Sequence, residues 1–224
     1  SRLGVSEKRI TTIYQGVDAD LRPISAAEFK ESQTDIPVTY GNYFIFVSTI
    51  EPRKNIMRLL TAYRLYRDSE GASALPLLVV GNPGWGSTEI HKELILLASE
   101  NSVIYPGYVE RKVLRLLIAG ARALLFPSIY EGFGLPVVEA MSSGTAVLTS
   151  KNSAMSEITG NAALLVDPSD PLSIFDSILR LHRDEKMVRR LEVEGLELSS
   201  RFTWEKCSIE TIRLYKSLTS GHIG

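Results

Sequence analysis

Two glutamates, Glu131 and Glu139, enclose the glycine-rich stretch Gly132-Phe133-Gly134 in the second half of the chain. Glycine permits a tight turn in which backbone approaches a ligand closely, and Pro136 suits the first turn of a helix that carries Glu139. The two carboxylates then lie roughly 8–12 Å apart, so each can accept hydrogen bonds from a different part of one ligand. An unpaired carboxylate is costly on the apolar helix around Glu139, which favours a functional role.

Two adjacent cations, Arg53 and Lys54, follow an apolar run within Glu51-Pro52-Arg53-Lys54-Asn55. If a strand ends there and a helix begins near Asn55, free backbone N–H groups and both cations converge, and together they can neutralise a diphosphate. The positive end of a helix dipole slightly disfavours cations, so a solvated helix start is the alternative. The local pair leaves both interpretations open.

Short apolar runs recur between amphipathic stretches, which is the order expected of a parallel sheet covered by helices on both faces. In such a doubly wound α/β fold, ligands bind beyond the carboxyl ends of the strands, where the cations and the glycine-rich stretch fall. The predicted strands are residues 10–14, 43–48, 75–80, 102–105, 123–126, 145–148 and 163–166.

Helical periodicity fills most of the gaps between these strands. Residues 1–40 contain polar and turn-forming stretches, so we expect them to be a lead-in to the main domain of residues 41–200. The chain opens at Ser1 without an initiator Met or a signal-peptide pattern, and we expect a fragment of a longer protein. The predicted helices with the clearest pattern are residues 55–67, 113–118, 170–181, 185–199 and 204–218.

The chain has 224 residues, of which 44% are hydrophobic and 23% charged, with a formal net charge of -1. This composition excludes disordered and collagen-like chains, and the balanced charge argues against nucleic acid as a partner. The single cysteine, Cys207, excludes an internal disulfide and a thiolate metal cluster and favours a reducing, cytoplasmic setting. The longest apolar stretch is far shorter than the roughly 20 residues that a membrane-spanning helix needs.

The glutamate pair within EGFGLPVVEAMSSG, the earlier EPRKN and the later Ser153-Ala154-Met155-Ser156-Glu157 occur in this order along the chain. Their combination resembles the donor half of the retaining GT-B glycosyltransferases of family 4, from about residue 13 to residue 204. The resemblance implies a Rossmann-like domain, the C-terminal half of a GT-B enzyme, that binds a nucleotide sugar. It also implies that transfer needs no metal and no cofactor besides this donor.

The resemblance assigns roles to individual residues. Arg53 and Lys54 would bind the donor diphosphate, and Glu131 with the amides of residues 132–134 would lie near the transferred sugar. The other implied contacts are Glu139 on the ribose hydroxyls, Leu135 beside the phosphates, and Tyr108 and Val109 beside the base. Thr49 stands where many members have an arginine, so Arg53 would carry more of the charge.

The same resemblance implies a missing N-terminal domain. Residues 1–40 would lead out of an inter-domain linker, and residues 201–224 would form a helix that crosses back to that domain. The absent half would bind a glycan or lipid-linked acceptor, and the full-length enzyme would associate peripherally with the inner face of the cytoplasmic membrane. His91, His182 and His222 match no catalytic motif.

The EPRKN variety is most similar to bacterial polysaccharide and lipopolysaccharide mannosyltransferases, so the expected donor is GDP-mannose, with UDP-hexoses as the alternative. A related GT-B epimerase or phosphorylase would keep the same nucleotide grip, and a binding module without activity of its own is also open. The stretch of residues 81–86 is rich in glycine but lacks the G-x-G-x-x-G spacing of a dinucleotide site.

Overall fold

The central sheet consists of short runs of apolar residues. Both of its faces are covered, so the side chains on both sides of its inner strands are buried. The computed structural model describes residues 6, 9–32, 34–100 and 103–220, and within them the sheet has six strands, all parallel. They are β1 (Phe44–Val47), β2 (Leu77–Val80), β3 (Val103–Gly107), β4 (Ala123–Phe126), β5 (Ala146–Ser150) and β6 (Leu164–Val166).

The strand order is β3-β2-β1-β4-β5-β6, so the chain builds outward from β1 and then returns to place β4 on its other side. The order reverses between β1 and β4, and ligands of open α/β sheets bind in the crevice beyond the carboxyl ends at such a point. The loops that follow β1 and β4 carry the two cations and the glycine-rich stretch. The predicted Rossmann-like, doubly wound α/β fold is confirmed.

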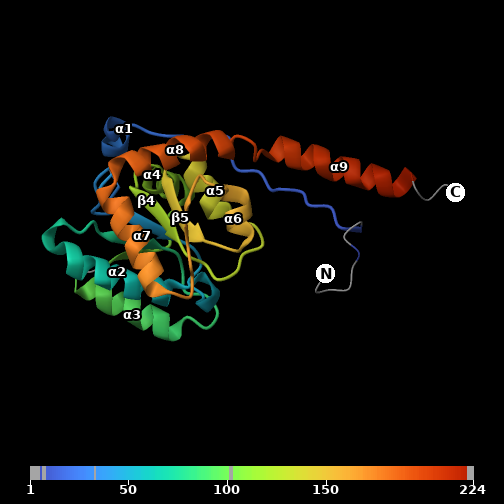
Figure 1. Cartoon of the computed structure of the whole chain (residues 1–224). Helices are drawn as coiled ribbons and strands as arrows, with labels where there is room; N and C mark the ends of the chain where they lie inside the picture. The colour runs from blue at the N-terminus through green and yellow to red at the C-terminus, as the bar shows by residue number, and fades with distance from the viewer. Residues whose placement is uncertain (1–5, 7–8, 33, 101–102, 221–224) are drawn as a thin grey trace.

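Helices cover both faces of the sheet (Figure 1). On one face α2 (Ile56–Glu70) packs against α7 (Pro171–Arg183), and on the other α5 (Leu135–Ser142) packs against α8 (Glu185–Ser199). The remaining helices are α1 (Ala26–Glu31), α3 (Thr88–Ser99), α4 (Arg111–Ala119), α6 (Ala154–Thr159) and α9 (Trp204–Ser220), with short 3-10 turns η2 (Pro52–Lys54) and η3 (Gly71–Ser73).

The predicted helices are confirmed to within a few residues at their ends. The bounds of α8 equal the predicted range, and α7 begins at Pro171 as expected. The side chain of Asp170 caps α7 by accepting a hydrogen bond from the Leu172 amide at 2.9 Å.

Residues 10–14, predicted as a strand, belong to no strand of the sheet. Their β-branched side chains favour extended backbone, but a strand also needs a neighbouring backbone along its length. The lead-in finds such a neighbour only further on, at a bridge between Val17 and Thr203. The prediction of a strand was therefore wrong. The predicted strand 102–105 is confirmed from Val103 onward, and residue 102 lies outside the described residues.

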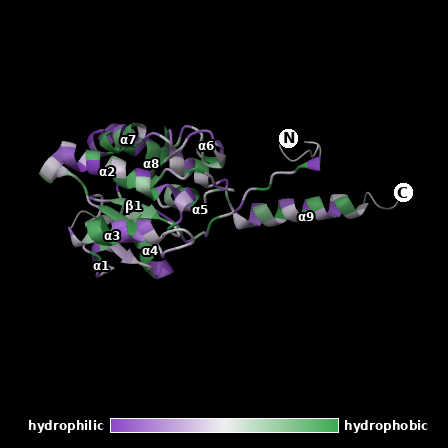
Figure 2. Ribbon diagram, turned by 90° about the horizontal axis from the view of Figure 1, so that it is seen from below, coloured by the Kyte–Doolittle hydropathy of each residue, from purple (hydrophilic) through white to green (hydrophobic). Residues whose placement is uncertain are grey.

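The two ends of the described chain leave the α/β body side by side. In Figures 1 and 2, α9 projects away from the sheet, and the lead-in runs out along the same side. Several apolar residues of α9 are exposed, among them Ile212 and Leu218. By contrast, Phe29 of α1 is buried in the main core against Tyr43, so part of the lead-in packs with the domain.

Candidate functional site

The loops after β1 and β4 are joined by hydrogen bonds. The Ile129 amide donates to the Arg53 carbonyl at 2.9 Å. The amide group of Asn55 donates to the carbonyls of Pro127 and Pro168 at 2.9 and 2.6 Å. Asn55 itself has a left-handed backbone, with φ at 62°, which asparagine tolerates better than most residues. These contacts hold both cations beside the glycine-rich loop.

Glu131 lies between the two predicted phosphate-binding cations. One of its oxygens is 2.6 Å from Nζ of Lys54, and the other is 2.9 Å from the guanidinium of Arg53. Ser128 donates a further hydrogen bond to Glu131 at 2.8 Å. The side chains of Lys54 and Glu131 are each 9% exposed, and the ammonium lies 5.3 Å from the ring centroid of Phe126. In this structure, Glu131 is thus the counter-charge of both cations.

The loop of residues 132–134 presents backbone donors at the start of α5. Within the part of the chain that the structure describes, the amides of Gly132, Phe133 and Gly134 donate no hydrogen bond. At Gly134 φ is 102°, and a Cβ atom would lie 2.9 Å from Cγ of Met155, so this position requires glycine. No side chain caps the helix at Gly134. Free amides at a helix start bind anions and hydroxyl oxygens.

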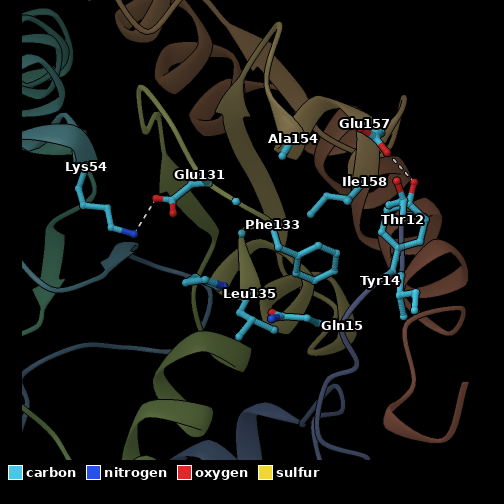
Figure 3. Close-up of a pocket in the computed structure, with 14 residues that line it drawn as sticks. Thr12, Tyr14, Gln15, Lys54, Glu131, Phe133, Leu135, Ala154, Glu157 and Ile158 are labelled. Atoms are coloured by element: carbon cyan, nitrogen blue, oxygen red, sulfur yellow. Dashed lines mark hydrogen bonds and ion pairs between the residues drawn. The ribbon is translucent and has the colours of Figure 1, made fainter. Parts of the chain in front are cut away.

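A cavity of about 550 Å³ joins these groups to the lead-in and to α6 (Figure 3). Figure 3 shows Lys54 and Glu131 at one end and Tyr14 with Glu157 at the other. Its lining consists of Thr12, Ile13, Tyr14, Gln15, Lys54, Glu131, Gly132, Phe133, Gly134, Leu135, Pro136, Ala154, Glu157 and Ile158.

Part of the predicted site meets in this cavity. The predicted residues in its lining are Lys54, Glu131, Gly132, Phe133, Gly134 and Leu135. Arg53 adjoins them through its ion pair with Glu131. The lining does not include Thr49, Tyr108, Val109 or Glu139.

Three of the predicted site residues follow strands β1 and β3 and are not in the lining of the cavity: Thr49, Tyr108 and Val109. Thr49 comes after β1, and a Cβ atom at Gly84 would lie 2.6 Å from its methyl group, so the loop after β2 packs closely against it. Tyr108 comes directly after β3 and is 69% exposed, while Val109 is partly buried. The roles predicted for these three residues stay predictions.

Glu139 occupies the middle of α5, and its carboxylate forms no hydrogen bond with another described residue. Burial raises the pKa of Glu139 above the ordinary glutamate value, although the nearby charges of Arg111 and Arg115 act against the rise. Both arginines instead bind Asp18, Arg115 at 2.7 Å. Glu139 therefore keeps its acceptor capacity for a ligand.

The sequence interpretation missed the far wall of the cavity. The hydroxyl of Tyr14 donates to Glu157 at 2.6 Å, and Thr12 and Gln15 flank Tyr14 in the lining. Glu157 belongs to a motif that the sequence singled out without a role. The sequence contains one indication for Tyr14, namely that it is an aromatic residue within the polar lead-in.

The described residues contain neither a candidate membrane span nor a candidate metal site. None of their helices is both long and apolar enough to cross a membrane. Within the described ranges, no three His, Cys, Asp or Glu side chains come together as metal ligands would.

A family model described as glycosyl transferases group 1 matches residues 29–197, which include the whole sheet and both loops of the site. O-antigen chain mannosyltransferase B of Escherichia coli is 36% identical to this chain over 210 residues. That alignment covers 94% of this chain and 55% of the relative, so the chain spans about half the length of that protein.

Solved structures have the same fold. Sucrose-phosphate synthase from Thermosynechococcus elongatus superposes with a TM-score of 0.74 at 26% identity, covering 92% of this chain and 52% of that one. Anabaena Alr3699/HepE in complex with UDP-glucose gives a TM-score of 0.82 at 20% identity, covering 96% of this chain and 60% of that one. The predicted resemblance to GT-B glycosyltransferases is confirmed, and the chain belongs to the group 1 glycosyl transferases.

Proposed function

We propose that this chain binds a nucleotide-diphosphate sugar and, in the complete enzyme, transfers its hexosyl group to an acceptor with retention of configuration. One observation carries the proposal. Lys54 and Glu131 line one cavity with the free amides of residues 132–134, at the point where the strand order reverses, and Arg53 adjoins it through its ion pair with Glu131. Cations and free amides suit a diphosphate, and a carboxylate suits sugar hydroxyls.

In the proposed complex the diphosphate takes over part of the pairing that Glu131 now provides to Arg53 and Lys54. Two positive charges fixed beside the leaving phosphates stabilise the negative charge that develops as the glycosidic bond breaks. The side chains need little rearrangement for this role, because hydrogen bonds from Ile129 and Asn55 already hold their loop in place. Arg53 carries more of the charge because Thr49 is neutral.

In the proposed complex, Glu131 then binds the sugar of the donor. Its carboxylate can accept two hydrogen bonds from sugar hydroxyls, and the amides of residues 132–134 supply donors. Glu139 accepts from the ribose hydroxyls, Leu135 lies beside the phosphates, and Tyr108 and Val109 contact the base. Resemblance to family 4 supports these positions, as does the free carboxylate of Glu139.

GDP-mannose is the proposed donor, supported by the 36% identity to the O-antigen mannosyltransferase. UDP-hexoses are the alternative, since the similar Anabaena protein was solved with UDP-glucose. The acceptor, a glycan or lipid-linked sugar, is proposed to bind the other half of a cytoplasmic enzyme associated peripherally with the membrane. The transfer is proposed to need no metal. On its own, this chain is expected to bind donor without turning it over.

Calorimetric titration with GDP, UDP, GDP-mannose and UDP-glucose tests the proposal. One base is expected to bind selectively. Glu139→Ala should weaken that nucleotide about tenfold or more by removing the acceptor of both ribose hydroxyls. Lys54→Ala should weaken diphosphates by a similar factor.

Lys92→Ala is the matched control, because Lys92 lies on α3, is 68% exposed and forms an ion pair with Glu89 at the surface. It should leave every affinity unchanged. Equal affinities for wild type, Lys54→Ala and Glu139→Ala would contradict the assignment of this cleft.

A further inference from the structure

Three aromatic rings from distant segments meet at the wall of the cavity. The ring centroid of Tyr14, in the lead-in, is 6.1 Å from that of Phe133 and 5.7 Å from that of Phe202. The rings of Phe133 and Phe202 are themselves 5.8 Å apart. Phe202, just before α9, is 7% exposed and belongs to the core. The cluster thus ties the glycine-rich loop to both chain ends.

Tyr14 is fixed from a second direction by α6. Its hydroxyl donates to Glu157 at 2.6 Å (Figure 3), and this hydrogen bond to a carboxylate raises the pKa of Tyr14. Glu157 and Ile158 line the same cavity, and Met155 of α6 lies directly against Gly134. The ring of Tyr14 is therefore held between α6 and Phe202, facing the loop.

The loop has few other attachments on this side. An added Cβ atom at Gly132 would meet nothing within 4 Å, so no neighbour packs closely there. The amides of residues 132–134 donate no hydrogen bond within the described chain. Phe133 is the one side chain between the two glycines, and its ring lies against the rings of Tyr14 and Phe202.

We propose that Tyr14 is a positioning residue for the sugar-binding loop. Its ring packs on Phe133 and its hydroxyl is anchored on Glu157, so that the amides of residues 132–134 stay aimed at the transferred sugar. The inference rests on the proposed function and adds a residue that touches neither the cations nor the phosphates. The lead-in thereby acts on sugar binding.

The first experiment measures loop order directly in the 224-residue chain. Backbone ¹⁵N relaxation should give order parameters near 0.85 for Gly132, Phe133 and Gly134 in the wild type, falling toward about 0.6 in Tyr14→Leu. Tyr14→Phe keeps the ring and should fall between them. Tyr215→Phe, at a tyrosine of α9 that is 63% exposed, is the matched control and should change nothing. Unchanged order parameters in both Tyr14 variants would overturn the proposal.

The second experiment separates positioning from general stability. Tyr14→Phe should weaken GDP-mannose or UDP-glucose about three- to tenfold, while the matching GDP or UDP keeps its affinity. Glu157→Ala should cause a similar loss, and the double variant should lose no more than either single variant, because both changes remove the same hydrogen bond between Tyr14 and Glu157. A loss shared equally by the nucleoside diphosphate would indicate a merely structural role and overturn the proposal.

The two proposals can fail separately. If none of the four nucleotides binds the wild type, the proposed function fails, and the sugar-binding part of this inference fails with it. If nucleotides bind and depend on Glu139, but the sugar contribution ignores Tyr14 and Glu157, only the positioning role is wrong.

Discussion

Glu131 is the central residue of the candidate site, because its carboxylate accepts hydrogen bonds from Lys54, Arg53 and Ser128 at once. A phosphate that enters must compete with Glu131 for the two cations. The arrangement keeps the nearly buried charge of Lys54 paired, where an unpaired charge is costly, and it also pairs the half-exposed Arg53. Under the proposed function, the same pairing is expected to lower the affinity of the cleft for phosphate alone.

Glu131→Gln is therefore expected to have two opposite effects. The free energy of unfolding should fall by about 1–3 kcal/mol, since the nearly buried Lys54 loses its counter-charge, while Arg53 keeps its ion pair with Glu51 at 2.8 Å. The affinity for GDP or UDP should rise several-fold, because the released cations are free for the diphosphate. Urea unfolding and calorimetry measure the two quantities. Weaker binding of the nucleoside diphosphate would show that Glu131 does not compete for the cations.

Glu139 gives a prediction about pH. Burial raises its pKa, so its contribution to stability is fully present below the pKa of the unfolded chain and is lost as the pH rises through the higher folded pKa. At neutral pH the ionised carboxylate therefore costs stability.

Glu139→Gln should raise the unfolding temperature by a few degrees at neutral pH, with a gain that shrinks toward zero near pH 4. Thermal unfolding across this range is the measurement. A gain that instead grows as the pH falls would contradict the raised pKa.

At the scale of elements, Asn55 joins the β1 loop to the β4 loop and to the segment before α7. Its amide group donates to two carbonyls that no helix or strand satisfies, and it begins α2 with a left-handed backbone. The position of the cations thus depends on a residue that is not in the lining of the cavity.

Comparing Asn55→Gly with Asn55→Ala separates these two contributions. Both lose the hydrogen bonds, which should cost about 1–3 kcal/mol of unfolding free energy. Asn55→Ala should cost about 1 kcal/mol more, because alanine disfavours the left-handed backbone. If alanine proves the more stable of the two in urea unfolding, the backbone at this position is not left-handed.

The elements themselves were largely predictable from local sequence. The apolar runs of β1, β2 and β4 and the periodicity of α7 and α8 identified them, because burial of each depends mainly on its own pattern. Residues 10–14 have strand-like composition but no pairing neighbour, which no local pattern reveals. The short helix α1, inside the polar lead-in, was not predicted either.

At the scale of the whole molecule, the two ends of the described chain cross beside the site. A Cβ atom at Gly16 would lie 2.1 Å from the backbone nitrogen of Trp204, and the Val17 amide donates to the Phe202 carbonyl at 3.1 Å. Asp18 continues the contact by binding Arg115 of α4 at 2.7 Å. Lead-in, α4 and α9 are therefore held together next to Glu139.

Gly16→Ala should separate the crossing segments, since the added methyl group meets backbone rather than a flexible side chain. Overpacking of this kind costs about 1–3 kcal/mol, which corresponds to an unfolding temperature lower by several degrees. Calorimetry and the amide shifts of Val17 and Thr203 measure it. An unchanged unfolding temperature would mean that the segments do not approach this closely.

The candidate site was predictable only in part, because some of its residues come together only in the tertiary fold. Lys54, Glu131 and the glycine-rich loop carry motifs whose spacing is local, and they meet in one cavity. Tyr14, Glu157 and Phe202 come together from three distant parts of the chain. Their proximity results from the tertiary fold, so no spacing in the sequence could predict it.

The most direct test of the central claim is to map the amide shifts of the ¹⁵N-labelled chain during titration with GDP-mannose and UDP-glucose. The largest shifts are predicted at residues 53–55, 131–135 and 139, with smaller ones at Tyr108 and Val109. The sugar-dependent part, obtained by subtracting the GDP or UDP titration, should concentrate at residues 131–134 and Tyr14. Shifts confined to residues 81–86 after β2, or no shifts at any of the predicted residues, would contradict a donor site in this cleft.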